Sequence, residues 1–262
     1  MPPTTKRLPT AQDFPSAITV TITPPPPSHP PTNILLLLHG LGDTHAPFAR
    51  LGAQMSLPET ACIAVRAPAP LPFDLGGYHW GDDVLFDERT GDMDPDAGFQ
   101  KAAARLLLDD VVRGVLVGKC GYAPRDVVLF GFAQGGMAAL QVAAELGRAG
   151  AGQELGGVVS VGGAAPAGAS LSSSSGKQEE EVGGKKKIKT PVLLCKAARG
   201  SSVSDAAVRR LKDSFEFAEV KEWRRVGDAM PSNRDEMLPI MQFFARRLKS
   251  VRGVPEGAVE IS

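Results

Sequence analysis

The sequence predicts one α/β domain of three layers, α/β/α, with a mostly parallel, doubly wound sheet and helices on both of its faces. Two observations predict this class. Short apolar segments alternate along the chain with longer segments of helical periodicity, and glycines or prolines separate them. The chain has 262 residues, 43% of them hydrophobic, which is enough for one large core. Such alternation is typical of right-handed βαβ connections, and therefore of a parallel sheet.

The first expected elements lie before residue 70. Residues 17–23 alternate like a strand and lead into the proline-rich loop PPPPSHPP. The segment NILLLLHG, residues 33–40, is almost continuously apolar, as in a strand buried on both faces. A helix over 46–55 then leads to a further strand over 61–68, which ends at prolines.

The remaining elements continue the alternation. They are a long amphipathic helix over 98–121, a strand over 127–133, a helix over 135–146, strands over 155–163 and 191–197, a helix over 203–215, a strand over 218–226 and a helix over 233–248. Ser204 is a natural N-cap for the helix that follows it, and Ser232 with Asp235 resembles a capping box. Pro239 predicts a kink in the last helix or a later start.

The predicted domain spans residues 17–250. A mobile, Pro-rich N-terminus over 1–16 precedes it and a C-terminal tail over 251–262 follows. Residues 169–189 combine four adjacent serines with an acidic and a basic triplet, which predicts a disordered insertion in a loop between strands. A docking or phosphorylation segment is the alternative for this insertion.

Charge and cysteine content exclude several function classes. Lys plus Arg and Asp plus Glu number 29 each, so no bulk charge favours nucleic acid as a partner. There is no ligand-spaced His/Cys set and no phosphate loop, so we expect neither a metal nor a cofactor. Three widely separated cysteines, Cys62, Cys120 and Cys195, indicate reduced thiols and a cytoplasmic or nuclear location. No apolar run is long enough for a transmembrane segment.

The stretch GFAQGG, which begins at Gly131, differs by one residue from the G-x-S-x-G nucleophile elbow of serine hydrolases. In that elbow a strand turns sharply into a helix, and the glycines at both ends allow so tight a turn. Gly131, Gly135, the preceding strand and the following helix are all present. Ala133 takes the place of the serine, and an alanine methyl cannot act as a nucleophile.

A second glycine-rich turn follows the buried strand, in LLLLHGLGD. In α/β-hydrolases this turn provides one oxyanion-hole amide, and the residue after the nucleophile provides the other. Here these would be the backbone N–H groups of Leu41 and Gln134. The alternative is that HGLGD forms only a tight turn.

Five stretches together resemble the phospholipase/carboxylesterase family, which includes the acyl-protein thioesterases. Within that family the sequence pattern is most similar to that of fungal-type homologues. The five stretches are NILLLLHGLGDTHAPFARL, the strand end at 66–70, YHWGDD, GFAQGGMAAL and DEMLPIMQFFARRL. The resemblance covers about residues 33–248. It implies an α/β-hydrolase fold and, for active members, cleavage of acyl esters or thioesters beside a groove for an acyl chain.

The resemblance also gives the positions of the catalytic triad. The nucleophile position is Ala133, the acid position falls on Gly200 in PVLLCKAARGSSV, and the histidine position falls on Met230 in GDAMPSNRDEM. The chain order in this fold is nucleophile, acid, histidine. The four histidines, His29, His39, His45 and His79, all precede the elbow, so a shifted alignment does not restore the base.

We therefore expect a catalytically inactive pseudo-hydrolase that binds an acyl or other hydrophobic small molecule or a protein partner. Pocket candidates are His39, His45, Phe73, His79 and Trp80, although His39 is also readable as a structural residue before its glycine turn. One alternative is weak or rewired hydrolysis, with Ser201, Ser202 or Asp205 as a substitute group, although these residues also fit ordinary loop and cap positions. Another is a structural subunit of a larger assembly, and a homodimer is left open.

Overall fold

The computed structural model describes residues 6–89, 91–150, 152–166 and 187–251. In this part of the chain a central sheet has the strand order β1-β3-β2-β8-β9-β10-β11, and all neighbours are parallel except β1 and β3. From β2 the chain first adds β3 on one side of the sheet and later adds β8 to β11 on the other side. This change of side confirms the doubly wound α/β class.

The strands of this sheet are β1 (Val20–Thr23), β2 (Asn33–Leu38), β3 (Thr60–Val65), β8 (Val127–Phe132), β9 (Gly157–Val161), β10 (Val192–Arg199) and β11 (Ala218–Val226). The long helices are α1 (His45–Met55), η2 (Gln100–Lys119), α2 (Gln134–Arg148), α3 (Asp205–Ser214) and α4 (Arg234–Arg247). Short elements are η1 (Ala11–Asp13), η3 (Pro124–Asp126) and the pairs β4 (Ala69–Pro70) with β5 (Tyr78–His79) and β6 (Leu85–Phe86) with β7 (Met93–Asp94).

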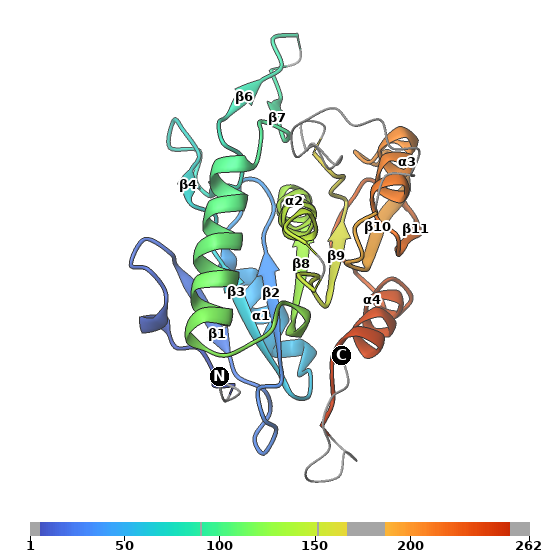
Figure 1. The fold of residues 1–262 in the computed structure, drawn as a ribbon. Helices are drawn as coiled ribbons and strands as arrows, with labels where there is room; N and C mark the ends of the chain where they lie inside the picture. Colours follow the sequence, from blue (N-terminus) through green and yellow to red (C-terminus); the bar gives the residue numbers. More distant parts are fainter. Residues whose placement is uncertain (1–5, 90, 151, 167–186, 252–262) are drawn as a thin grey trace, which may run out of the picture.

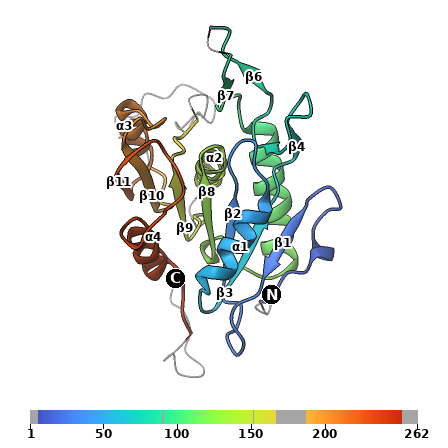
Figure 2. The same cartoon turned by 180° about the vertical axis from the view of Figure 1, so that it is seen from behind.

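The helices cover the sheet on both faces (Figures 1 and 2). One core cluster joins alternate residues of β2, such as Ile34 and Leu36, to apolar residues of η2, α2 and α3. The other joins Leu35 and Leu37 to α1 and α4. Because successive strand residues point to opposite faces, a strand covered on both sides must be apolar throughout. All six residues of β2 are buried, as the continuous apolar run predicts.

The helix boundaries follow the capping residues, with one correction. Ser204 caps α3 as predicted, since its side chain accepts a hydrogen bond from the Ala207 amide. At α4 the predicted capping box of Ser232 and Asp235 is wrong by one residue. Asn233 is the cap and accepts from the Glu236 amide, while the Glu236 carboxylate accepts from the Ser232 amide. Pro239 lies inside α4, so the alternative of a later helix start is also wrong.

The boundaries of the predicted flexible segments also differ from expectation. The N-terminus was expected to be mobile through residue 16, but the described part packs on the domain: Phe14 is buried and the Arg7 amide donates to the Cys120 carbonyl. Lys187–Lys189 were expected to lie in the insertion, but Ile188 is buried and bridges to Phe215. The rest of the predicted insertion, residues 169–186, lies largely outside the described residues.

All three cysteine thiols are free and buried. In the described residues no helix is both long and apolar enough to cross a membrane.

Candidate functional site

The elbow joins β8 to α2 at the carboxyl end of the sheet. Ala133 has φ 47° and ψ −115°, a backbone conformation that residues other than glycine rarely adopt. Its amide donates to the Val161 carbonyl over 2.8 Å, and its carbonyl accepts from the Met137 amide over 3.1 Å. The strained turn of a serine hydrolase is therefore present at the residue that lacks the serine.

The glycines of the elbow are required by close backbone approaches. A Cβ atom at Gly131 would overlap the backbone of Gly135 and Gly136. A Cβ atom at Gly135 would overlap the carbonyls of Leu38 and His39, at the end of β2. The turn after β2 therefore lies against the start of α2, as the two glycine-rich motifs predict.

The backbone amides predicted as oxyanion-hole donors, those of Leu41 and Gln134, belong to the two turns described above. Leu41 lies in the turn after β2, where the Asp43 amide donates to the Gly40 carbonyl, and Gln134 is the first residue of α2. Within the described residues no hydrogen bond uses the Leu41 N–H as a donor. Their role as anion donors stays a prediction.

The side chain of Gln134 is buried and holds the segment after β5 against the elbow. Its Oε1 accepts a hydrogen bond from the Trp80 amide over 2.8 Å, and its Nε2 donates to the Pro95 carbonyl over 3.2 Å. This side chain is therefore used for structure.

His39 is held as a neutral imidazole by two backbone groups. The Ala67 amide can act only as a donor, so Nε2 of His39 accepts from it over 3.0 Å, and Nδ1 donates to the Gly40 carbonyl over 2.8 Å. Burial lowers the pKa of His39 below its ordinary value. Both ring nitrogens are thus occupied, which agrees with the structural interpretation of this residue.

The other pocket candidates lie around this turn. Trp80 is fully buried and its indole N–H donates to the His39 carbonyl over 2.8 Å. His45 begins α1 and His79 lies in β5, and burial lowers the pKa of both. Phe73 is 83% exposed.

The other two predicted triad positions are Gly200 and Met230. Gly200 has φ 63° and lies just after β10. Met230 lies in the loop between β11 and α4. Lys196, in β10 four residues before Gly200, is buried, and its ammonium lies 3.4 Å from the Asp205 carboxylate and 3.8 Å from that of Glu222.

A carboxylate joins the loops in which the acid and the base would lie. Asp228 accepts hydrogen bonds from the Ala197 amide, the Ser201 hydroxyl, and the Ser202 amide and hydroxyl, all within 3.0 Å. The serines predicted as substitute catalytic groups are therefore donors to this carboxylate. The sequence analysis did not identify Asp228. Its position two residues before Met230 was the one feature that could have indicated a role near the site.

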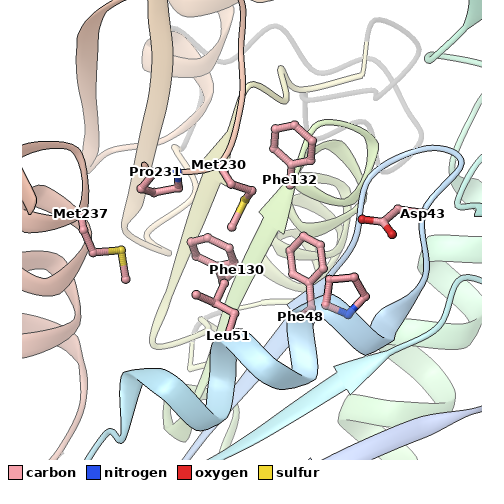
Figure 3. A pocket seen from close by; sticks show the side chains of 9 residues that line it. Asp43, Phe48, Leu51, Phe130, Phe132, Met230, Pro231 and Met237 are labelled. Carbon is pink, nitrogen blue, oxygen red and sulfur yellow. The ribbon is translucent and has the colours of Figure 1, made fainter. Parts of the chain in front are cut away.

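A cavity of about 280 Å³ opens beside β8 on the face covered by α1 and α4 (Figure 3). Its lining consists of Asp43, Pro47, Phe48, Leu51, Phe130, Phe132, Met230, Pro231 and Met237. Met230, which the resemblance places at the histidine position, is therefore a wall of this cavity. None of the five pocket candidates from the sequence belongs to the lining, because His39 and Trp80 pack into the turn instead.

In the described part of the chain, no group of three or more His, Cys, Asp or Glu side chains could hold a metal ion.

The doubly wound sheet, the strained turn into α2 and the β2 turn beside it define the class of α/β-hydrolase folds. Within this class the chain belongs to the phospholipase/carboxylesterase family, whose sequence profile matches residues 23–243.

Two fungal relatives are known only as uncharacterized hydrolases. The one from Schizosaccharomyces pombe is 28% identical over 235 residues, which cover 88% of this chain and 89% of the relative. The one from Mycosarcoma maydis is 38% identical over 135 residues, about half of each chain (50% and 49%).

Among solved structures, esterase PE8 is similar with a TM-score of 0.67 and 22% identity. Zea mays acyl-protein thioesterase 2 is similar with a TM-score of 0.60 and 20% identity. In both cases 88% of this chain and 99% of the other chain are covered. At this level of identity the likeness confirms the fold that the sequence resemblance implied.

Proposed function

We propose that this protein is a catalytically inactive member of the phospholipase/carboxylesterase family that binds a hydrophobic small molecule. The single observation that carries the proposal is the strained elbow at Ala133, which has the geometry of a nucleophile site and no nucleophile. Acyl transfer by this fold needs a hydroxyl or thiol at that position and a base to take its proton.

The histidines support the absence of a base. Both ring nitrogens of His39 are bonded to backbone groups. Among the described residues, no hydrogen bond joins the rings of His39, His45 or His79 to a hydroxyl or a thiol. The position that the family resemblance assigns to the base holds Met230, whose thioether cannot accept a proton at neutral pH.

The acid position supports the same conclusion. Gly200 has no side chain, and the carboxylate that is present, Asp228, accepts bonds from serine hydroxyls and amides instead of from an imidazole. The apolar cavity at Met230 supports binding in place of chemistry.

The test measures covalent labelling by a fluorophosphonate probe together with turnover of p-nitrophenyl and acyl-thioester substrates. We expect no labelled serine, and turnover equal to that of a heat-denatured sample. Labelling at any serine, or turnover clearly above that background, would reject the proposal and favour the rewired hydrolase.

Engineered variants make a negative result informative. The Ala133→Ser variant should stay unlabelled by the fluorophosphonate probe, because it has a nucleophile but no base. The triple variant Ala133→Ser, Gly200→Asp and Met230→His rebuilds all three predicted triad positions. Asp tolerates a positive φ better than most residues, which suits position 200. Circular dichroism of each variant separates missing chemistry from misfolding.

A further inference from the structure

The cavity at Met230 combines an apolar body with a charged rim. Aromatic and sulfur-containing side chains line the body, among them Phe48, Phe130, Phe132 and Met237. Methionine side chains adapt to irregular apolar ligands and make favourable contacts with aromatic rings. At about 280 Å³ the cavity is near the lower end of the range for small-molecule pockets, roughly 300 to 1,000 Å³.

Among the described residues that line the cavity, Asp43 alone carries a charge. Its Oδ1 accepts a hydrogen bond from the Thr44 amide over 2.7 Å, which fixes the carboxylate. Figure 3 shows the carboxylate at the rim, with its oxygens on the side of the cavity. No cation of the described residues forms an ion pair with it. The carboxylate is therefore not already paired with a cation of the described residues and can attract a cationic group of a ligand.

We propose that this cavity binds a molecule with a short apolar chain and a cationic amine head, the chain among Phe48, Phe132 and Met230 and the amine at Asp43. The proposal rests on the proposed function, since Met230 lines the cavity in place of a catalytic imidazole. A partly buried carboxylate attracts an ammonium group and repels the carboxylate of a free fatty acid. The site therefore selects ligands by the sign of the charge on the head group.

The test uses three probes with one chain length, n-octylamine, octan-1-ol and octanoate, each titrated against the full chain by calorimetry at low and high salt. We expect octylamine to bind saturably at one site, octanol to bind about tenfold more weakly, and octanoate to bind weakest. Raising the salt should weaken the amine and leave the alcohol unchanged.

Two variants locate the binding. Asp43→Asn should weaken octylamine about tenfold without changing octanol, whereas the matched Asp213→Asn, at an exposed acid on α3, should change neither. Leu51→Trp fills the cavity and should abolish binding of both probes. Leu51→Phe is the milder filler if the tryptophan variant fails to fold by circular dichroism.

The inference is overturned if octanoate binds as tightly as octylamine, if Asp43→Asn leaves octylamine binding unchanged, or if none of the three probes binds. None of these outcomes bears on the proposed absence of catalysis, which labelling and turnover decide separately. Conversely, turnover with intact octylamine binding would reject the inactive-hydrolase proposal and leave this site in place.

Discussion

The Asp228 carboxylate lies 3.0 Å from the Ser202 hydroxyl and joins the loop after β11 to the loop after β10. In an active member of this fold the acid and the histidine would connect the same two loops. Here the two loops are also connected, but the carboxylate, Asp228, lies in the loop after β11. Its partners are hydroxyl and amide groups at the end of β10 and in the loop that follows. The loops that contain the predicted acid and histidine positions, Gly200 and Met230, are thus held together.

We expect Asp228→Ala to lower the free energy of unfolding by about 2 kcal/mol, because the buried Ala197 amide and the two serines lose their acceptor. Urea titration followed by circular dichroism measures this. Asp213→Ala removes an exposed acid and should stay within about 0.5 kcal/mol of wild type. Equal effects of the two variants would contradict the assigned role of Asp228.

The strain at Ala133 predicts a stabilising substitution. Glycine adopts φ 47° without a Cβ penalty of about 1–2 kcal/mol, although its more flexible unfolded state takes back part of the gain. We expect Ala133→Gly to raise the free energy of unfolding by about 0.5–1 kcal/mol in the same urea titration. Ala139→Gly, inside α2, is the matched control and should destabilise. A destabilised Ala133→Gly variant would show that the elbow is unstrained.

Acid should destabilise the protein through the buried imidazole of His39. Burial lowers the pKa of His39, so the unfolded chain binds a proton that the folded chain does not. This contribution to stability is complete above the unfolded value of about 6.5 and declines as the pH falls below it. The urea concentration at the unfolding midpoint should therefore decrease as the pH is lowered from 7.5 to 5.

His39→Asn should reduce that pH dependence, because the amide can donate and accept in place of the ring but does not titrate. The corresponding change at His29, in the proline-rich loop, serves as the control. An unchanged pH slope in His39→Asn would contradict the assigned protonation of this residue.

The buried thiols should resist alkylation in the folded state. Burial raises the pKa of Cys62 and of Cys195 to about 12 in each case, so the reactive thiolate is scarce at pH 8, on the order of one molecule in ten thousand. Mass spectrometry after iodoacetamide treatment should show little labelling without denaturant and complete labelling in guanidinium. Rapid labelling of the native protein at Cys195 would contradict the burial of this strand.

The sequence was sufficient for the strands of the central sheet, the long helices and the elbow, because these depend on local patterns, but it did not predict the short elements η1, η3 and β4 to β7. The apolar run of β2 and the paired glycines at 131 and 135 follow from backbone requirements that any such fold imposes. The cap of α4 was misplaced by one residue, because serine, asparagine and aspartate are all good caps and only the backbone geometry selects Asn233.

The cavity was not predictable in the same way. Its lining comes from α1, β8 and the segment from Met230 to Met237, which are far apart in the sequence and meet only through the strand order. Asp43 ends the glycine-rich turn motif, and nothing in the local sequence indicates that its carboxylate lines an apolar cavity. Packing places two of the predicted pocket residues, His39 and Trp80, inside the turn, and no local pattern indicates this.

Lys6, near the beginning of the chain, and Lys249, near its end, contact the same buried carboxylate of Asp126, at 2.8 Å and 3.1 Å. The two ends of the domain therefore lie within one side-chain length of a common anchor. A circular permutant that joins residues close to 6 and 249 through a short flexible peptide should fold, with new ends in a surface loop elsewhere. Folding of such a permutant would separate the order of the elements along the chain from the arrangement of the sheet.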